Sequence, residues 1–235
     1  MKQRPFLTAY WHNLLNLTYQ VPPELLLPLL PNGLTLDVQN GKAFASLVAF
    51  DFRDTKVRGL KIPFHVNFPE INLRYYVKHG DKRAVCFVTE FVPKFCIAFV
   101  ADRLYNEPYQ SLNMRSETYT ESGRINIAHY FTKEGKTYFI KATALNTPQQ
   151  AAENSPEHYF KEHDTGFGSD KRGRTLSYKV LHPIWRTYPL EKHEIQVDFG
   201  HLYGPQWAFL NHEQPFSALL AEGSAIEVYS PYIMK

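Results

Sequence analysis

Cysteine is scarce in this sequence, and neither of the two cysteines belongs to a metal-binding or redox pattern. Cys86 and Cys96 both lie within apolar runs, and no CxxC spacing is present. We therefore expect two buried, reduced side chains in an intracellular protein. The ten histidines form neither an HxH nor an HExxH pattern. The sequence thus predicts no metal site, and nothing in it indicates a cofactor.

Long apolar runs, strong net charge and familiar catalytic motifs are missing as well. The apolar runs are shorter than the ~18 residues that cross a bilayer, and His12, Asn13 and Asn16 interrupt the N-terminal stretch. That stretch does not read as a signal peptide, so we expect a cytoplasmic protein with no membrane partner. A net charge of +3 with scattered Lys and Arg predicts no nucleic-acid partner. No GxSxG, P-loop or GxGxxG motif is found.

Aromatic residues are abundant and favour β structure. They make up 15% of the 235 residues, and they pack well on the faces of sheets. Asn40-Gly41 predicts a hairpin between residues 34–38 and 43–52, Gly80-Asp81 one between 71–79 and 83–91, and residues 133–136 a third. Further strands are expected at 112–120, 175–181 and 225–234.

Short helices are predicted between these strands. Proline in the first turn suits a helix over residues 22–30, apolar spacing predicts one over 94–105, and Ser155-Pro156 predicts one that ends near residue 163. No βαβ alternation and no convincing linker is found. The sequence therefore predicts a single domain, residues 1–235, of the β-rich α+β class, whose antiparallel strands curl on themselves.

Residues 68–77, FPEINLRYYV, place three polar side chains on one face of a predicted strand. Glu70, Asn72 and Arg74 alternate with apolar residues, so all three project to the same side. Two interpretations stay open at this point. Either this face meets water, or it lines a polar interior in which Glu70 and Arg74 pair.

Other polar side chains also suit a ligand. Arg103 lies near the end of the helix at 94–105, where it either complements the helix dipole or holds an anion. Tyr109 and Gln110 follow a proline at the start of a strand. His182 lies at a strand end near Trp185, where it is either packed or in contact with a ligand.

Five stretches of the chain together resemble a known family. They are VPPELLLPLLPNGLTLDVQNGKAFASLVAF, FPEINLRYYVKHGDKRAVCFV, AFVADRLYNEPYQSLNM, SPEHYFKEH and RGRTLSYKVLHPIW. From about Trp11 to Tyr232, the chain resembles the YqjF-like bacterial domain of unknown function, DUF2071, which is similar in fold to acetoacetate decarboxylase. The resemblance implies a curved antiparallel sheet that closes into a cone or barrel around an internal cavity.

The same resemblance points to a missing catalytic lysine. Acetoacetate decarboxylases attack their substrate with a Schiff-base lysine in a Pro-Lys-Lys segment. The corresponding segment here is residues 107–111, in which Tyr109 and Gln110 stand where the lysine pair would be. A phenol and an amide form no Schiff base, so this chemistry is not expected. Glu70 falls where the decarboxylases carry a glutamate in the pocket.

Three functions are compatible with these features. The first is binding of a small organic anion, such as a carboxylate, in the cavity by Glu70, Arg74, Arg103, Tyr109, Gln110 and His182. The second is a lyase, decarboxylase or hydratase that acts on an oxo acid by non-covalent acid/base chemistry, with Glu70 and Tyr109 in proton transfer. The third is a structural domain with a filled core that serves subunit assembly. A homo-oligomer is compatible with all three.

Overall fold

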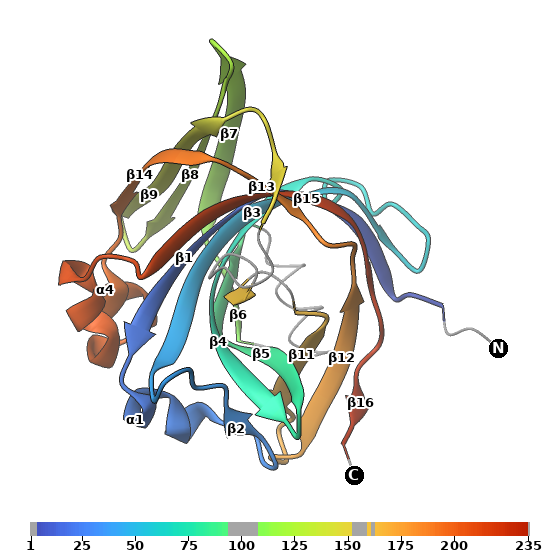
Figure 1. Cartoon of the computed structure of the whole chain (residues 1–235). Helices are drawn as coiled ribbons and strands as arrows, with labels where there is room; N and C mark the ends of the chain where they lie inside the picture. Colours follow the sequence, from blue (N-terminus) through green and yellow to red (C-terminus); the bar gives the residue numbers. More distant parts are fainter. Residues whose placement is uncertain (1–3, 94–107, 152–158, 161–162, 235) are drawn as a thin grey trace.

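The fold is organised around a ring of strands. The computed structural model describes residues 4–93, 108–151, 159–160 and 163–234. The strands that pair in turn around the ring are β1 (Leu7–Val21), β3 (Ala43–Val57), β4 (Phe68–His79), β5 (Lys82–Val92), β11 (Thr165–Ser169), β12 (Thr175–Leu181) and β15 (Ser217–Val228). β15 pairs with β1 as well as with β12, which closes the sheet on itself (Figure 1). Neighbours are antiparallel except for β5 and β11.

Shorter strands extend the ring, and a second sheet stands beside it. The extensions are β2 (Thr35–Leu36), β6 (Tyr109–Ser111), β10 (Gln149–Gln150), β13 (Arg186–Tyr188) and β16 (Tyr232–Ile233). The second sheet contains β7 (Asn113–Glu121), β8 (Arg124–Lys133), β9 (Lys136–Leu145) and β14 (Leu190–Gln196). The helical segments are α1 (Pro23–Leu26), η1 (Leu27–Leu29), α4 (Phe199–Tyr203) and η2 (Pro205–His212). Side chains of the second sheet and of α1, α4 and η2 join the outer face of β1, β3 and β4 in the main core.

Most of the predicted elements are confirmed. The hairpins β4–β5 and β8–β9, the strands β7 and β12, and the helix after Pro22 lie where the sequence predicts them. In the β8–β9 turn, Glu134 and Gly135 have φ of 48° and 80°, the left-handed conformation that a two-residue hairpin requires. The curved, self-closing sheet with few short helices is confirmed as a whole.

The predicted hairpin at Asn40-Gly41 is wrong in its first arm. Asn40 and Gly41 do form a turn, with φ of 50° and 76°, but the preceding strand β2 pairs with β4 instead of β3. The reason is a buried ion-paired group. The carboxylate of Asp37 lies 3.1 Å from Lys78 Nζ and 2.6 Å from Arg83 Nε, and these contacts hold the segment beside β4 and β5.

Two predicted helices fall largely outside the described residues. None of residues 94–105 is described, and of 155–163 only Tyr159 and Phe160 are described as helical. Cys86 is a buried thiol, as expected, whereas Cys96 lies outside the described residues. No helix in the described part of the chain is long and apolar enough to cross a membrane.

Strands β3 and β4 are buried on both faces. Alternate residues point to opposite sides of a strand, and here one side joins the main core while the other faces the inside of the ring. Glu70 and Asn72 face the inside, and each is only 3% exposed. Of the two interpretations of residues 68–77, these two side chains therefore agree with the inward-facing one and do not meet water.

Candidate functional site

A cavity of about 400 Å³ lies on the inner face of the ring. This volume is within the range of roughly 300–1,000 Å³ found for small-molecule sites. Its wall is mostly apolar, and the aromatic side chains in it are those of Phe6, Trp11, Phe50, Phe52, Phe68, Phe87, Tyr109 and Tyr178. These residues enclose a cavity, whereas the assembly-domain hypothesis requires a completely filled interior.

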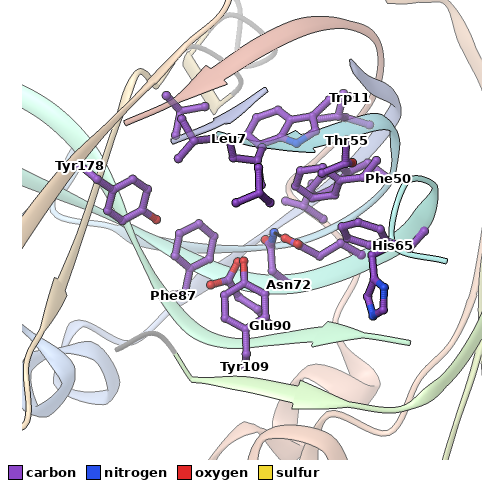
Figure 2. A pocket seen from close by; sticks show the side chains of 18 of the residues that line it. Leu7, Trp11, Phe50, Thr55, His65, Asn72, Phe87, Glu90, Tyr109 and Tyr178 are labelled. Carbon is purple, nitrogen blue, oxygen red and sulfur yellow. Dashed lines mark hydrogen bonds between the residues drawn. The ribbon is translucent and has the colours of Figure 1, made fainter. Parts of the chain in front are cut away.

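Polar side chains from adjacent strands line one side of the cavity. Asn72 on β4 lies opposite Glu90 on β5, and Glu90 lies opposite Tyr109 on β6. Glu70, two residues before Asn72, accepts a hydrogen bond of 3.0 Å from the Asn72 amide. Figure 2 shows Asn72, Glu90 and Tyr109 gathered on this side, across the cavity from Leu7 and Trp11. We call Glu70, Asn72, Glu90 and Tyr109 the polar wall.

Irregularities in the strands bring several of these side chains to the cavity. The β4–β5 register shifts between Leu73 and Arg74, and the extra residue in β5 lets both Phe87 and Glu90 face inward. The β1–β3 register shifts twice, near Asn13 and near Asp54, where φ is 55° and 53°. These shifts reverse the side-chain alternation and place Trp11, Leu14 and Thr55 all on the cavity side.

Polar atoms of four residues in the cavity wall are buried without a hydrogen-bond partner in the described part of the chain. They are Trp11 Nε1, Thr55 Oγ1, Asn72 Oδ1 and Arg74 Nε. A buried polar atom left unpaired costs roughly 1–3 kcal/mol, so evolution retains such groups only where they serve another purpose or meet ordered water.

Replacing one of these atoms with a methyl group should therefore stabilise the protein. We expect Thr55→Val to raise the free energy of unfolding by about 1 kcal/mol, because the hydroxyl it removes has no partner. Thr18→Val is the matched control, since the buried Thr18 hydroxyl bonds to Asn16 and Ser46 at 3.1 and 2.7 Å. It should destabilise by about 1 kcal/mol. Urea unfolding checks both, and a loss of stability in Thr55→Val would contradict the assignment.

Arg74 is held at the cavity wall by a backbone carbonyl. Its Nη2 donates to the Phe160 carbonyl at 2.9 Å, which also accepts from Asn16 and from the Tyr76 hydroxyl. Nearby, the His163 ring packs 5.1 Å from the Tyr76 ring, centroid to centroid. Burial first, and then the charges of Arg74 and Arg83, lower the pKa of His163 well below its usual value, so its ring is neutral at pH 7.

The other side chains expected at a ligand site have different positions. Gln110 is exposed and does not line the cavity, because strand alternation turns it away from Tyr109. The His182 ring stacks on Trp185 with centroids 4.1 Å apart, and it borders a separate, more open hollow. His182 is thus packed against Trp185 and does not belong to the cavity wall. Arg103 lies outside the described residues.

Sequence reasoning missed Glu90, Trp11 and Thr55. Glu90 is the only carboxylate in the run VCFVTEFV, and that isolation in an apolar strand was an available signal. For Trp11 and Thr55, the bulges that aim them inward leave no recognisable pattern in the sequence. No lysine lines the cavity among the residues described, and those residues contain no cluster of His, Cys, Asp and Glu suited to a metal ion.

Comparisons with solved structures agree with this architecture. An acetoacetate decarboxylase-like enzyme from Sphingomonas wittichii RW1 matches with a TM-score of 0.66 and 13% identity over 97% of this chain and 93% of that one. Acetoacetate decarboxylase from Legionella pneumophila matches with a TM-score of 0.66 and 10% identity, over 99% and 88%. The enduracididine biosynthesis enzyme MppR complexed with pyruvate gives 0.66 and 12%, over 100% and 92%. At these identities the likeness establishes the fold alone.

Sequence comparison identifies the family. The uncharacterized protein YqjF of Bacillus subtilis (strain 168) is 32% identical over 108 residues, which cover 46% of this chain and 45% of YqjF. The match therefore spans about half the length of that relative. The model of the DUF2071 family, described as an uncharacterized conserved protein, matches residues 8–225. The chain thus belongs to the DUF2071 family and has the acetoacetate decarboxylase-like fold.

Proposed function

We propose that the cavity binds a small, largely apolar organic molecule whose polar end meets the polar wall. The observation that carries this proposal is the set of buried, unpartnered atoms of Trp11, Thr55, Asn72 and Arg74, described above. A ligand that offers a donor to Asn72 Oδ1 and an acceptor to Trp11 Nε1 or Arg74 Nε would satisfy atoms that the described residues leave unpaired. The aromatic wall would bury the rest of the ligand.

The sequence favours a carboxylate as the polar end, and we keep it as one option. Arg74 supports it, because its buried Nε lies in the cavity wall and a guanidinium binds carboxylates well. Glu70 and Glu90 oppose it, because a third carboxylate beside two others is electrostatically disfavoured. The alternative is a neutral polar end that both donates and accepts hydrogen bonds, such as an amide or a hydroxyl. The experiment must distinguish it from a carboxylate.

A displacement assay tests the proposal. The dye N-phenyl-1-naphthylamine fluoresces in apolar sites and is titrated into the protein, then displaced by p-xylene, p-cresol, p-toluamide or p-toluate. These compounds share one ring and differ in the polar end. We expect the best polar compound to displace at a concentration at least about tenfold lower than p-xylene. Absence of dye binding, or equal displacement by all four compounds, would contradict the proposal.

A matched pair of variants ties the result to the polar wall. Asn72→Leu replaces the amide with an apolar group that has the same branching and number of heavy atoms, so it should reduce the advantage of the polar compounds while the dye still binds. Thr89→Val makes a similar polar-to-apolar change one residue from Glu90 but does not alter the cavity lining. It should leave the displacement order unchanged.

Non-covalent acid/base catalysis is the second candidate, and the pairing of Glu90 with Tyr109 across β5 and β6 favours it. A carboxylate and a phenol side by side in an apolar cavity suit proton transfer to and from an oxo acid. Tyr109→Phe separates the two functions. An enzyme should lose roughly 10²–10⁴ in rate, whereas a binding protein should lose only about 1 kcal/mol in affinity.

Covalent Schiff-base chemistry is expected to be absent. The protein is incubated with a panel of oxo acids and aldehydes, reduced with borohydride, and its intact mass is measured beside acetoacetate decarboxylase as the positive control. We expect no adduct, because no lysine is among the described residues of the cavity wall. A stoichiometric adduct that maps to one lysine would overturn this expectation.

A further inference from the structure

The loop that joins β3 to β4 exposes large apolar side chains. Leu60, Ile62 and Phe64 are 72%, 45% and 88% exposed. Figure 1 shows this connection, in cyan, projecting from the ring of strands near the N-terminal end of β1. Exposed apolar side chains that occur singly need no explanation, but three in one short loop make it a candidate contact surface.

Backbone hydrogen bonds hold this loop in its shape. Val57 and Leu60 bond to each other's carbonyls at 2.9 and 3.0 Å, and the Arg58 N–H donates to the Phe6 carbonyl at 2.7 Å. The His65 N–H donates to the Ile62 carbonyl at 3.0 Å. The apolar side chains are therefore presented to solvent by an ordered segment.

The charges around these side chains are mainly positive. From residue 54, near the end of β3, to residue 65 in the loop, the chain carries Lys56, Arg58 and Lys61 against the single acid Asp54. Asp54 pairs with both lysines, at 3.2 and 2.5 Å, so one of the two lysine charges is not compensated. This segment thus holds two of the three net positive charges of the whole chain.

The same loop borders the cavity. Ile62 and His65 belong to the cavity wall, together with Val57 at the end of β3. Leu60 and Phe64 do not line it. An apolar, basic surface is therefore continuous with a mostly apolar cavity.

We propose that the loop and the adjoining end of β3, residues 54–65, dock on an anionic lipid surface, with Leu60 and Phe64 inserted and Lys56, Arg58 and Lys61 near the headgroups. Apolar insertion and attraction of basic residues to anionic lipid act together in such contacts. A second copy of the chain fits less well, because a two-fold contact would bring this positive loop against its own copy. The expectation of no membrane partner came from the lack of a spanning segment and does not concern a surface contact. The proposal goes beyond ligand binding, since docking does not require an occupied cavity.

Vesicle co-sedimentation of the full chain tests this proposal. We expect at least about tenfold stronger partitioning to phosphatidylglycerol–phosphatidylcholine vesicles than to phosphatidylcholine alone, with the difference lost in high salt. The double variant Leu60→Ser/Phe64→Ser should reduce partitioning to the anionic vesicles by at least about tenfold. The control Ile184→Ser/Tyr232→Ser removes side chains that are similarly exposed, at 59% and 58%, in other segments, and should bind like the unmodified chain.

Each contrary result has a definite meaning. No partitioning to anionic vesicles, or equal partitioning of the Leu60/Phe64 variant, would overturn the proposal. So would a concentration-dependent dimer in solution that the same variant abolishes, because the loop would then be a contact between copies. Titration with N-phenyl-1-naphthylamine keeps the two proposals apart, since neither Leu60 nor Phe64 lines the cavity and dye binding by this variant should be unchanged.

Discussion

Replacing Gly223 with alanine should destabilise the protein by about 3–5 kcal/mol. Gly223 lies on β15 opposite His12 of β1, with φ of +80°. An added Cβ would overlap the carbonyl oxygen of Trp11 and lie 2.7 Å from its carbonyl carbon. β1 is paired on both sides and cannot move away. Backbone strain and overpacking each contribute about 1–3 kcal/mol.

Gly33→Ala is the matched control for this substitution. Gly33 has nearly the same φ, +81°, but a Cβ there would meet nothing within 4 Å. It should cost only the conformational strain, about 1–2 kcal/mol. Urea unfolding of both variants gives the comparison. Equal losses would show that the contact with the Trp11 carbonyl contributes nothing.

Lowering the pH from 7 to 5 should destabilise the protein, and His163 should account for up to about 2 kcal/mol of the loss. Its pKa is lowered well below the unfolded value of 6.5 by burial and then by Arg74, Arg83 and His182, which face it from β4, β5 and the end of β12. Below pH 6.5 the unfolded state therefore binds a proton that the folded state does not bind. Stability is therefore lost as the pH falls below 6.5, because protonation of the unfolded state is favoured over that of the folded state.

The variant His163→Phe isolates this contribution. Neither ring nitrogen of His163 has a partner in the described part of the chain, so phenylalanine should be tolerated at pH 7. The variant should lose less stability than the unmodified protein between pH 7 and pH 5, by up to about 2 kcal/mol, measured by urea unfolding at each pH. Burial also lowers the pKa of His129. The stability of the variant should therefore still depend on pH, but less steeply. An unchanged dependence in the variant would contradict the account.

The elements that could be predicted from the sequence are those whose signals are local. The turns at Gly80-Asp81 and Glu134-Gly135 define hairpins whose arms are adjacent in the chain. The first arm of the Asn40-Gly41 hairpin was mispredicted because its pairing depends on Asp37 and its distant partner Arg83. The closing contact between β12 and β15 joins segments that are also distant in sequence, and no local pattern indicates it.

The candidate site could be predicted only on the strand that keeps a regular alternation. Between Phe68 and Arg74, β4 alternates regularly, so Glu70, Asn72 and Arg74 were correctly placed on one face. In β1, β3 and β5 a bulge reverses the alternation. That is why neither Glu90 nor Trp11 could be assigned to the cavity from periodicity.

The decisive experiment is a crystal structure of the protein with the strongest displacing compound of the p-xylene series. We expect the ring of the ligand to lie among the aromatic side chains of the cavity. Its polar end should lie within about 3.2 Å of Asn72 Oδ1, or of Trp11 Nε1 or Arg74 Nε. Ordered water on these atoms, with the compound bound elsewhere, would show that the polar wall serves hydration and would contradict the account.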